Sequence, residues 1–178
     1  SIVTNLLESK KDKENKIFKN NFKLNINLNE VYINEFDFIK NLQGLIFIKD
    51  NKVVDANLSA NFENNKNIIF SIETTDNDEK ITKLYSSKAK PLVKRYKFIK
   101  GFDEGNLDFV STKKNEKSVS NLKIYDFKLK EVPALTKLLT LASLQGIADI
   151  LTGEGIRFEE FEMNFSNEKN SMVIDELY

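Results

Sequence analysis

Strict alternation of apolar and polar residues is the feature that most constrains this 178-residue chain. In the segment 22–28, FKLNINL, every second residue is apolar and the residues between are Lys or Asn. The segments 53–62, VVDANLSANF, and 67–75, NIIFSIETT, repeat the pattern. A period of two is typical of strands in a sheet with one dry face and one wet face. The dry face of such a sheet must pack against helices, a second sheet or a ligand.

Short polar segments separate these strands, at 49–52, 63–66 and 76–78. They are rich in Asn, Asp and Lys, and the first two of these favour turns. Strands joined by such short connections pair with their neighbours in antiparallel fashion. We therefore expect residues 1–82 to form an antiparallel strand meander.

A shift of the alternation recurs in three segments: 31–38 (VYINEFDF), 122–129 (LKIYDFKL) and 156–163 (IRFEEFEM). In each one the apolar positions move by one residue halfway along. A strand keeps the same face dry across such a shift only if it absorbs an extra residue, most simply in a β-bulge. The pattern predicts a bent, curved sheet, although this composition also produces such shifts by chance.

A first helix is predicted near 88–98, where Ala89, Leu92, Val93 and Tyr96 form one apolar stripe. Pro91 is tolerated only in the first turn of a helix, so the helix should begin close to Lys90. It should end before the glycine at position 101.

A second helical stretch is predicted over 133–152, where two apolar stripes meet at Ser143. Pro133 suits the first turn and Gly153 the C-terminal cap. The longest uncharged run, 138–148, is much shorter than the ~20 apolar residues that cross a bilayer. This stretch is therefore predicted to lie with its apolar stripes on another part of the protein.

The chain contains no Cys and no His, and its 27 basic side chains balance its 27 acidic ones. The missing residues exclude thiol and imidazole chemistry, zinc sites of the N/S type and disulfides. The balanced charge gives no overall attraction for nucleic acid. Carboxylate pairs such as Glu159 and Glu160 lie in expected turns or at an expected bulge, and none is assigned a catalytic role. We expect no enzymatic activity, no cofactor and no metal site.

Basic residues gather between Ile81 and Phe102 without an intervening acid. They are Lys83, Lys88, Lys90, Lys94, Arg95, Lys97 and Lys100. Such a cluster attracts anionic lipid headgroups or nucleic-acid phosphates, or it forms the solvated side of an amphipathic helix. We favour the solvated side.

The segment 131–165, EVPALTKLLTLASLQGIADILTGEGIRFEEFEMNF, resembles the C-terminal signature of AsmA-like proteins, in the YhdP-type branch related to TamB. The signature has a proline-led helix, a Leu-Leu-x-Leu-x-Ser-Leu-x-Gly core and a Leu-x-Gly-x-Gly-Ile-x-Phe turn before alternating strands. The matching residues are Pro133, Leu138, Leu139, Leu144, Gly146, Leu151, Gly153, Gly155, Ile156 and Phe158. The likeness covers residues 84–178 and is only generic over the earlier strands.

The resemblance implies the periplasmic portion of an inner-membrane-anchored bacterial protein, with the anchor outside this chain. The chain would be a single β-rich segment, in which 83–178 form the helix-strand-helix-strand signature region. It implies phospholipid or another acyl lipid, the rest of a longer chain and envelope membrane proteins as partners. It supplies no catalytic residues, and nucleic acid is not expected as a partner.

The expected fold is therefore α+β and β-dominated. A curved, bulged antiparallel sheet would form an open hydrophobic groove, with short amphipathic helices near 88–98 and 133–152 covering part of it. The candidate lining residues are Phe22, Leu24, Ile26, Phe70, Ile72, Leu122 and Ile124. The expected function is the shielding of acyl chains during transfer toward the outer membrane. Two alternatives stay open: a closed α+β domain that binds a small hydrophobic ligand, and a purely structural envelope scaffold.

Overall fold

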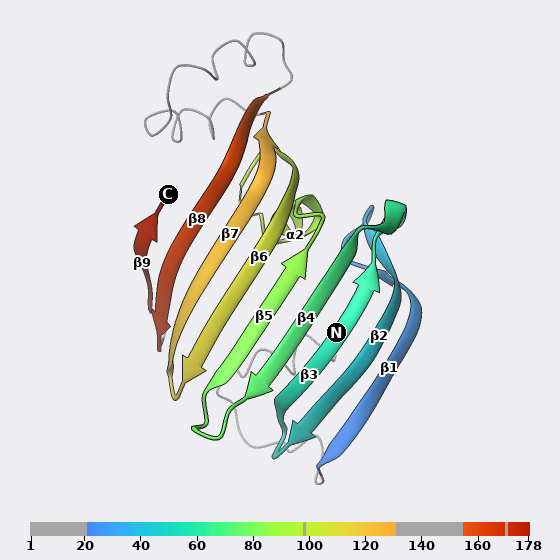
Figure 1. The fold of residues 1–178 in the computed structure, drawn as a ribbon, viewed down its shortest axis with the longest axis vertical. Coiled ribbons are helices and arrows are strands. Elements are labelled where there is room, and N and C mark those ends of the chain that lie inside the picture. Colours follow the sequence, from blue (N-terminus) through green and yellow to red (C-terminus); the bar gives the residue numbers. More distant parts are fainter. Residues whose placement is uncertain (1–20, 98, 131–154, 170) are drawn as a thin grey trace.

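The computed structural model describes residues 21–97, 99–130, 155–169 and 171–178. These residues form one antiparallel sheet of nine strands that follow one another in sequence order (Figure 1). The strands are β1 (Phe22–Tyr32), β2 (Phe38–Lys49), β3 (Lys52–Asn61), β4 (Asn67–Thr74), β5 (Lys80–Ser86), β6 (Phe102–Lys114), β7 (Lys117–Leu129), β8 (Ile156–Glu168) and β9 (Ser171–Leu177). The 3-10 helix η1 (Glu63–Asn65) and the α-helix α2 (Lys90–Tyr96) complete the described elements. The expected β-dominated antiparallel architecture is confirmed, whereas the helix expected over 133–152 lies outside the described residues.

The strand register collects the apolar side chains on one side of the sheet, which we call the apolar face. One row of directly paired residues crosses all the strands, and Gly44 is its only member without a side chain. The row is Ile26, Gly44, Leu58, Phe70, Leu84, Phe109, Leu122, Met163 and Leu177. A Cβ on Gly44 would lie 1.9 Å from the backbone oxygen of Asn57, so β3 leaves no room for a side chain there. The alternation read from the sequence thus lines up across strands that are distant in the chain.

The shift of alternation in 122–129 falls where the strand ladder is interrupted. Tyr125 and Phe127 of β7 pair with both neighbours, whereas Asp126 between them pairs with neither. Asp126 has a φ of 53°, and Gly105 and Glu159 are skipped at the same level of β6 and β8. Each of the three strands therefore has one unpaired residue at this level, and the register of pairing is the same on both sides of it. The shifts in 122–129 and 156–163 are confirmed, but they form one step across three strands instead of separate β-bulges.

The shift in 31–38 was assigned wrongly to the middle of a strand. Residues 33–37 form the turn between β1 and β2. The side-chain oxygen of Asn34 accepts hydrogen bonds from the backbone N–H groups of Phe36 (2.9 Å) and Asp37 (3.0 Å). Asn side chains stabilise reversals in this way because they offer the backbone a local partner.

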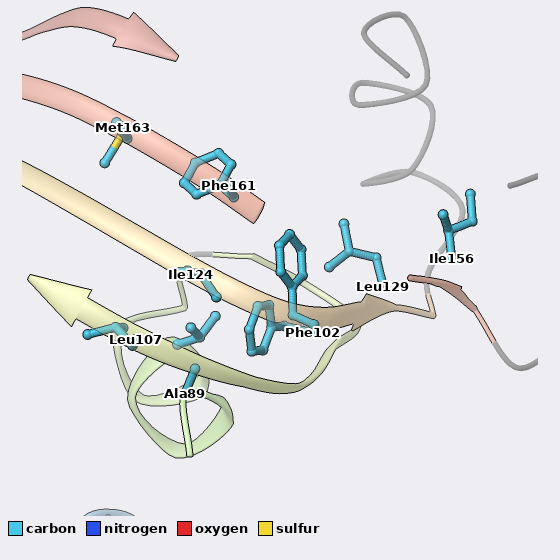
Figure 2. Close-up of a cluster of buried hydrophobic side chains, with 10 residues drawn as sticks. Ala89, Phe102, Leu107, Ile124, Leu129, Ile156, Phe161 and Met163 are labelled. Atoms are coloured by element: carbon cyan, nitrogen blue, oxygen red, sulfur yellow. The ribbon is translucent and has the colours of Figure 1, made fainter. Parts of the chain in front are cut away.

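Helix α2 begins at Lys90, as Pro91 predicts, and lies behind the sheet in Figure 1, near the upper ends of β5 and β6. Ala89 and Val93 are buried, Leu92 is half-buried, and Tyr96 is 76% exposed, so Tyr96 does not belong to the packed stripe. Ala89 points toward Leu107 and Ile124 of the sheet (Figure 2). Helix α2 therefore covers the apolar face near the middle of β6 and β7, at the level where β5 ends.

The buried side chains form three separate clusters. The largest contains Ala89, Val93, Phe102, Leu107, Ile124, Phe127, Leu129, Ile156, Phe161 and Met163. The two smaller ones lie in the first four strands and their turns, around Ile48, Val53, Ala56 and Ile72, and around Ile39, Ala60 and Phe62. The largest packed part of the molecule is thus formed by α2 together with β6, β7 and β8.

Candidate apolar binding face

The residues proposed from the sequence to line a groove all lie on the apolar face. Phe22, Leu24 and Ile26 come from β1, Phe70 and Ile72 from β4, and Leu122 and Ile124 from β7. The register places them in the row described above or in adjacent rows of the same face. The alternation therefore identified one continuous surface.

Exposure divides these candidates into two groups. Ile124 is 0% exposed and Ile72 is 4% exposed, so both belong to packed clusters. Leu24 is 41% exposed, and Phe22, Ile26, Phe70 and Leu122 are half-buried. Only the second group is accessible to a ligand. The sequence could not make this division, because it depends on what lies over each residue.

Sequence reasoning missed several members of the same face. Leu84 of β5 and Phe109 of β6 are half-buried and lie between Phe70 and Leu122 in the row. Their signal was available in the segments 80–86 and 105–113, where apolar and polar residues alternate in part.

The first hairpin reaches over the apolar face to α2. Lys88 forms an ion pair with Asp37 at 3.3 Å, and Arg95 donates a hydrogen bond to the backbone oxygen of Ile33. The ammonium group of Lys94 lies 4.8 Å from the ring centroid of Phe36, a cation–π contact. Residues of the β1–β2 turn and of α2 that are far apart in sequence thus close this end of the face.

The Asp37 carboxyl group is held ionised in this contact. Partial burial acts to raise its pKa, but hydrogen bonds from Asn34 and Lys88 outweigh burial and leave the pKa below its ordinary value. The charge therefore stays available for Lys88. The basic residues near α2 were expected to be merely solvated, whereas Lys88, Lys94 and Arg95 bind their own chain.

A second set of ion pairs fixes the start of α2 to the ends of the central strands. Asp103 lies 2.7 Å from Lys90 and 2.5 Å from Lys130, and the hydrogen bonds from Lys130 and Lys90 hold its pKa far below the ordinary value. Glu104 beside it pairs with Lys128 at 3.0 Å and with Arg157 at 2.9 Å. These cations neutralise carboxylates and anchor structure.

The side chains on the apolar face change character along β5, β6 and β7. Near α2 they are Leu107 and Ile124, and the next rung holds Phe109 and Leu122. Beyond it lies a rung of hydroxyl groups, Thr82, Ser111 and Ser120, in which Ser120 donates a hydrogen bond to Ser111 at 2.9 Å. Lys80 and Lys113 form the last rung. The face therefore runs from apolar at the α2 end to cationic at the other end.

Two shallow hollows lie on the opposite, polar face. One, of about 480 Å³, is lined by Val110, Thr112, Lys114, Lys117, Val119, Ser120, Asn121 and Asn164. The other, of about 470 Å³, is lined by Asn25, Ile26, Asn27, Gln43, Gly44, Leu45, Asn57 and Ser59. The second hollow includes Ile26 and Gly44 of the apolar row, but neither hollow runs along that row across the sheet. The described residues thus do not show the expected groove, which stays a prediction.

The carboxyl groups in the described part of the chain are relevant to metal binding and to acid-base catalysis. That part contains no group of three or more carboxylates placed to hold a metal ion. Its carboxyl groups with shifted pKa values, at Asp37, Asp103, Glu104 and Glu162, all have pKa values below the ordinary one because of cationic or amide partners. None of these four is set up as a proton donor at neutral pH. No helix among the described residues is long and apolar enough to cross a membrane.

Three residues of the AsmA-like signature are described, and the rest, from Pro133 to Gly153, lie outside the described residues. Gly155 has a φ of 85°, and a Cβ there would lie 2.6 Å from the backbone oxygen of Leu129, so the approach of β8 to β7 requires glycine. Ile156 is buried, and the ring of Phe158 stacks on Phe127 at 5.2 Å. These roles are structural.

Comparison with known proteins does not extend this resemblance. A scan against protein-family models, a search of curated proteins and a search of solved structures each found no match to this chain. Membership of the AsmA-like family therefore stays a prediction that rests on the residues of the signature.

Proposed function

We propose that this chain is a non-enzymatic lipid-binding segment that holds acyl chains on the apolar face of its sheet. One observation carries the proposal: the row of apolar residues crosses all nine strands, and α2 and the β1–β2 turn cover only one end of that face among the described residues. Sheets of soluble domains usually bury such a face. A large exposed apolar surface marks a binding site.

The energetic advantage of an acyl chain on this face follows from its length. Each CH₂ group removed from water contributes about 0.8 kcal/mol, so even partial coverage of a long chain gives substantial affinity. Neighbouring strands are about 4.8 Å apart, which makes the face roughly 38 Å wide across nine strands. That width is greater than the ~15 Å thickness of the hydrocarbon layer in one bilayer leaflet, which an acyl chain spans.

The AsmA-like resemblance supplies the proposed setting. The segment would belong to an inner-membrane-anchored envelope protein and would shield phospholipid chains from the aqueous periplasm during transfer toward the outer membrane. Transfer would be passive, because a chain that moves between two apolar surfaces loses little free energy per CH₂ group.

A closed α+β domain is disfavoured as the alternative, because β1 and β9 are the two edges of the described sheet and do not pair. A purely structural scaffold is the remaining alternative. It differs from the proposal in one measurable respect, since a scaffold carries no lipid.

The test is native mass spectrometry of the chain purified from cells, with lipids identified after extraction. The double variant Leu24→Asp, Leu28→Asp places two charges on the exposed part of the apolar face, where these residues are 41% and 49% exposed. We expect it to lose most of the co-purified lipid, because a buried charge opposes binding of an acyl chain.

The matched control is Leu45→Asp, Ile69→Asp. These residues are similarly exposed, at 51% and 42%, but lie on the polar face, where they pair with Asn25 and Asn57 and with Ser59 and Tyr85 respectively. The control should keep its lipid. A wild-type chain without any bound lipid would support the scaffold, and equal lipid loss in both variants would contradict the assignment to the apolar face.

A further inference from the structure

Lysines face each other across the strands at the end of the apolar face farthest from α2. Lys80 of β5 pairs directly with Lys113 of β6. Like charges in directly opposite positions destabilise a sheet, so this pair costs the fold stability. No carboxylate of the described residues lies within 4.0 Å of Lys80, Lys113 or the nearby Lys52. The charge at this position is therefore not neutralised by the described protein.

The ammonium group of Lys80 is held in place. It donates a hydrogen bond of 2.6 Å to the backbone oxygen of Val53, so its side chain reaches across the end of β4 to β3. An ammonium group has three N–H donors, and this bond uses one of them. Partial burial lowers the pKa of Lys80, and the charges of Lys113 and Lys52 lower it further. A nearby anion would act in the opposite direction, because its charge favours the protonated form of Lys80.

Other lysines near the two ends of the sheet do not share this environment. Lys49 and Lys52 pair directly, but they follow the apolar-face pair of Ile48 and Val53 by one position and so lie on the polar face. Lys114 and Lys117 also pair across strands, at the same end of the sheet, but they line the hollow on the polar face. Lys114 also has a carboxylate partner, Glu79, at 3.0 Å. At the α2 end, Lys88 and Lys90 are bound by Asp37 and Asp103. Lys80 and Lys113 thus combine a place on the apolar face with the lack of a carboxylate partner.

We propose that Lys80 and Lys113 bind the anionic phosphate-type headgroup of an amphiphile whose chain lies along the apolar face. This inference rests on the proposed lipid-binding function and adds to it the class of headgroup and the orientation of the ligand. The headgroup lies at the lysine rung, and the chain runs over Thr82 and Ser111 toward Leu107 and α2. In Figure 1, α2 lies near the upper end of β5, whereas the C-terminal end of β6, which carries Lys113, lies at the lower end of the strands.

The dimensions of the face suit such a ligand. Leu107 and Lys113 are six residues apart on one strand, which corresponds to about 20 Å at ~3.4 Å per residue. One leaflet of a bilayer accommodates a chain in about 15 Å. The acyl chain would therefore end near α2, where the apolar side chains are already buried. The headgroup would bind at the cationic end of the face.

The experiment is isothermal titration calorimetry of the full chain with three soluble probes. Dodecyl phosphate carries both chain and anion, dodecyl maltoside carries the same chain with a neutral headgroup, and inorganic phosphate carries the anion alone. The variant Lys80→Gln, Lys113→Gln should bind dodecyl phosphate about 30-fold more weakly, since each lysine near an anionic headgroup contributes roughly a factor of five. Its affinity for dodecyl maltoside should not change.

The matched control is Lys114→Gln, Lys117→Gln, which removes the same charge at the same end of the sheet but from the polar face. It should bind both amphiphiles as the wild type does. Lys113→Gln alone, a change at an exposed side chain, should give about a fivefold loss and guards against misfolding of the double variant. Circular dichroism and urea unfolding check the fold of each variant.

The other possible outcomes show which of the two proposals, the headgroup site or lipid binding, is wrong. Equal affinity of wild type and Lys80→Gln, Lys113→Gln for dodecyl phosphate overturns the headgroup site but leaves lipid binding intact. Equal losses in the polar-face control overturn it as well, because they indicate general attraction by net charge. Inorganic phosphate that binds as tightly as dodecyl phosphate shows a free-anion site instead of a lipid headgroup site. A wild type that binds neither amphiphile overturns both proposals.

Discussion

Both β1 and β7 alternate apolar and polar residues, with a shift at Asp126 in β7, but the outcome for the side chains on the apolar face differs. Ile124 and Leu129 in β7 are 0% exposed, whereas Leu24 and Leu28 in β1 are 41% and 49% exposed. The first pair lies in the cluster that includes α2, and the second pair has no comparable cover among the described residues. Alternation therefore determines which face a residue occupies, and the cover determines whether that residue stabilises the fold or is free to bind a ligand.

The covered region should be the most sensitive to truncation. Ile124→Ala leaves a cavity beneath α2, and we expect a loss of about 3 kcal/mol in the free energy of unfolding, since such substitutions in packed cores cost roughly 2 to 5 kcal/mol. Urea unfolding followed by circular dichroism measures it. A loss below about 1 kcal/mol would contradict the assignment of this residue to a closed core.

Attachment of α2 to the sheet should depend on Asp103. Asp103→Asn removes a carboxylate that binds Lys130 and Lys90, and we expect a loss of about 1 to 2 kcal/mol at neutral pH. The pKa of Asp103 is lowered in the folded protein, so its stabilising effect is complete above the ordinary value of 3.8 and declines as the pH falls below it. The difference between wild type and variant in urea unfolding should therefore shrink from pH 7 to pH 3.

Glu104→Gln is the control for that prediction. Glu104 also contacts two cations, but its side chain is 45% exposed, against 18% for Asp103, and exposed ion pairs contribute under about 1 kcal/mol. Equal effects of the two substitutions would mean that the contact with α2 at Lys90 contributes nothing specific.

Truncation of a side chain in the uncovered part of the apolar face, in β1, should lower the free energy of unfolding least. Leu24→Ala removes a side chain that is already 41% exposed, and we expect a loss below about 1 kcal/mol, because little apolar area returns to water. The same urea measurement serves. A loss as large as that of Ile124→Ala would show that β1 is covered, and the contrast between the two regions would disappear.

Much of the fold could be predicted from local signals. Asp50 and Asn51, with φ values of 49° and 61°, form the turn expected over 49–52, and Pro91 placed the start of α2 correctly. The pattern around Asp126 revealed an irregular position in β7, because a shift of alternation has a local cause. The same pattern around Asn34 led to a wrong prediction of an irregular strand, because there it arises from a turn that a side chain stabilises.

The candidate site was less predictable. The sequence found the right face through residues such as Leu24 and Leu122, but it could not separate them from the buried Ile124. It also assigned the basic residues near α2 to solvent, whereas Lys88 is 51 residues away from its partner Asp37. The pairing of Lys80 with Lys113 could not be predicted from the sequence, because 33 positions separate them in the chain.

The sequence by itself determined that the chain forms an antiparallel sheet with one apolar face, because side-chain alternation and turn chemistry act over a few residues. Only the tertiary structure decided which part of that face α2 covers, how the β1–β2 turn closes one end and which lysines meet at the other. These features depend on contacts between residues that are distant in the chain, and such contacts are set by strand register and packing of the whole sheet.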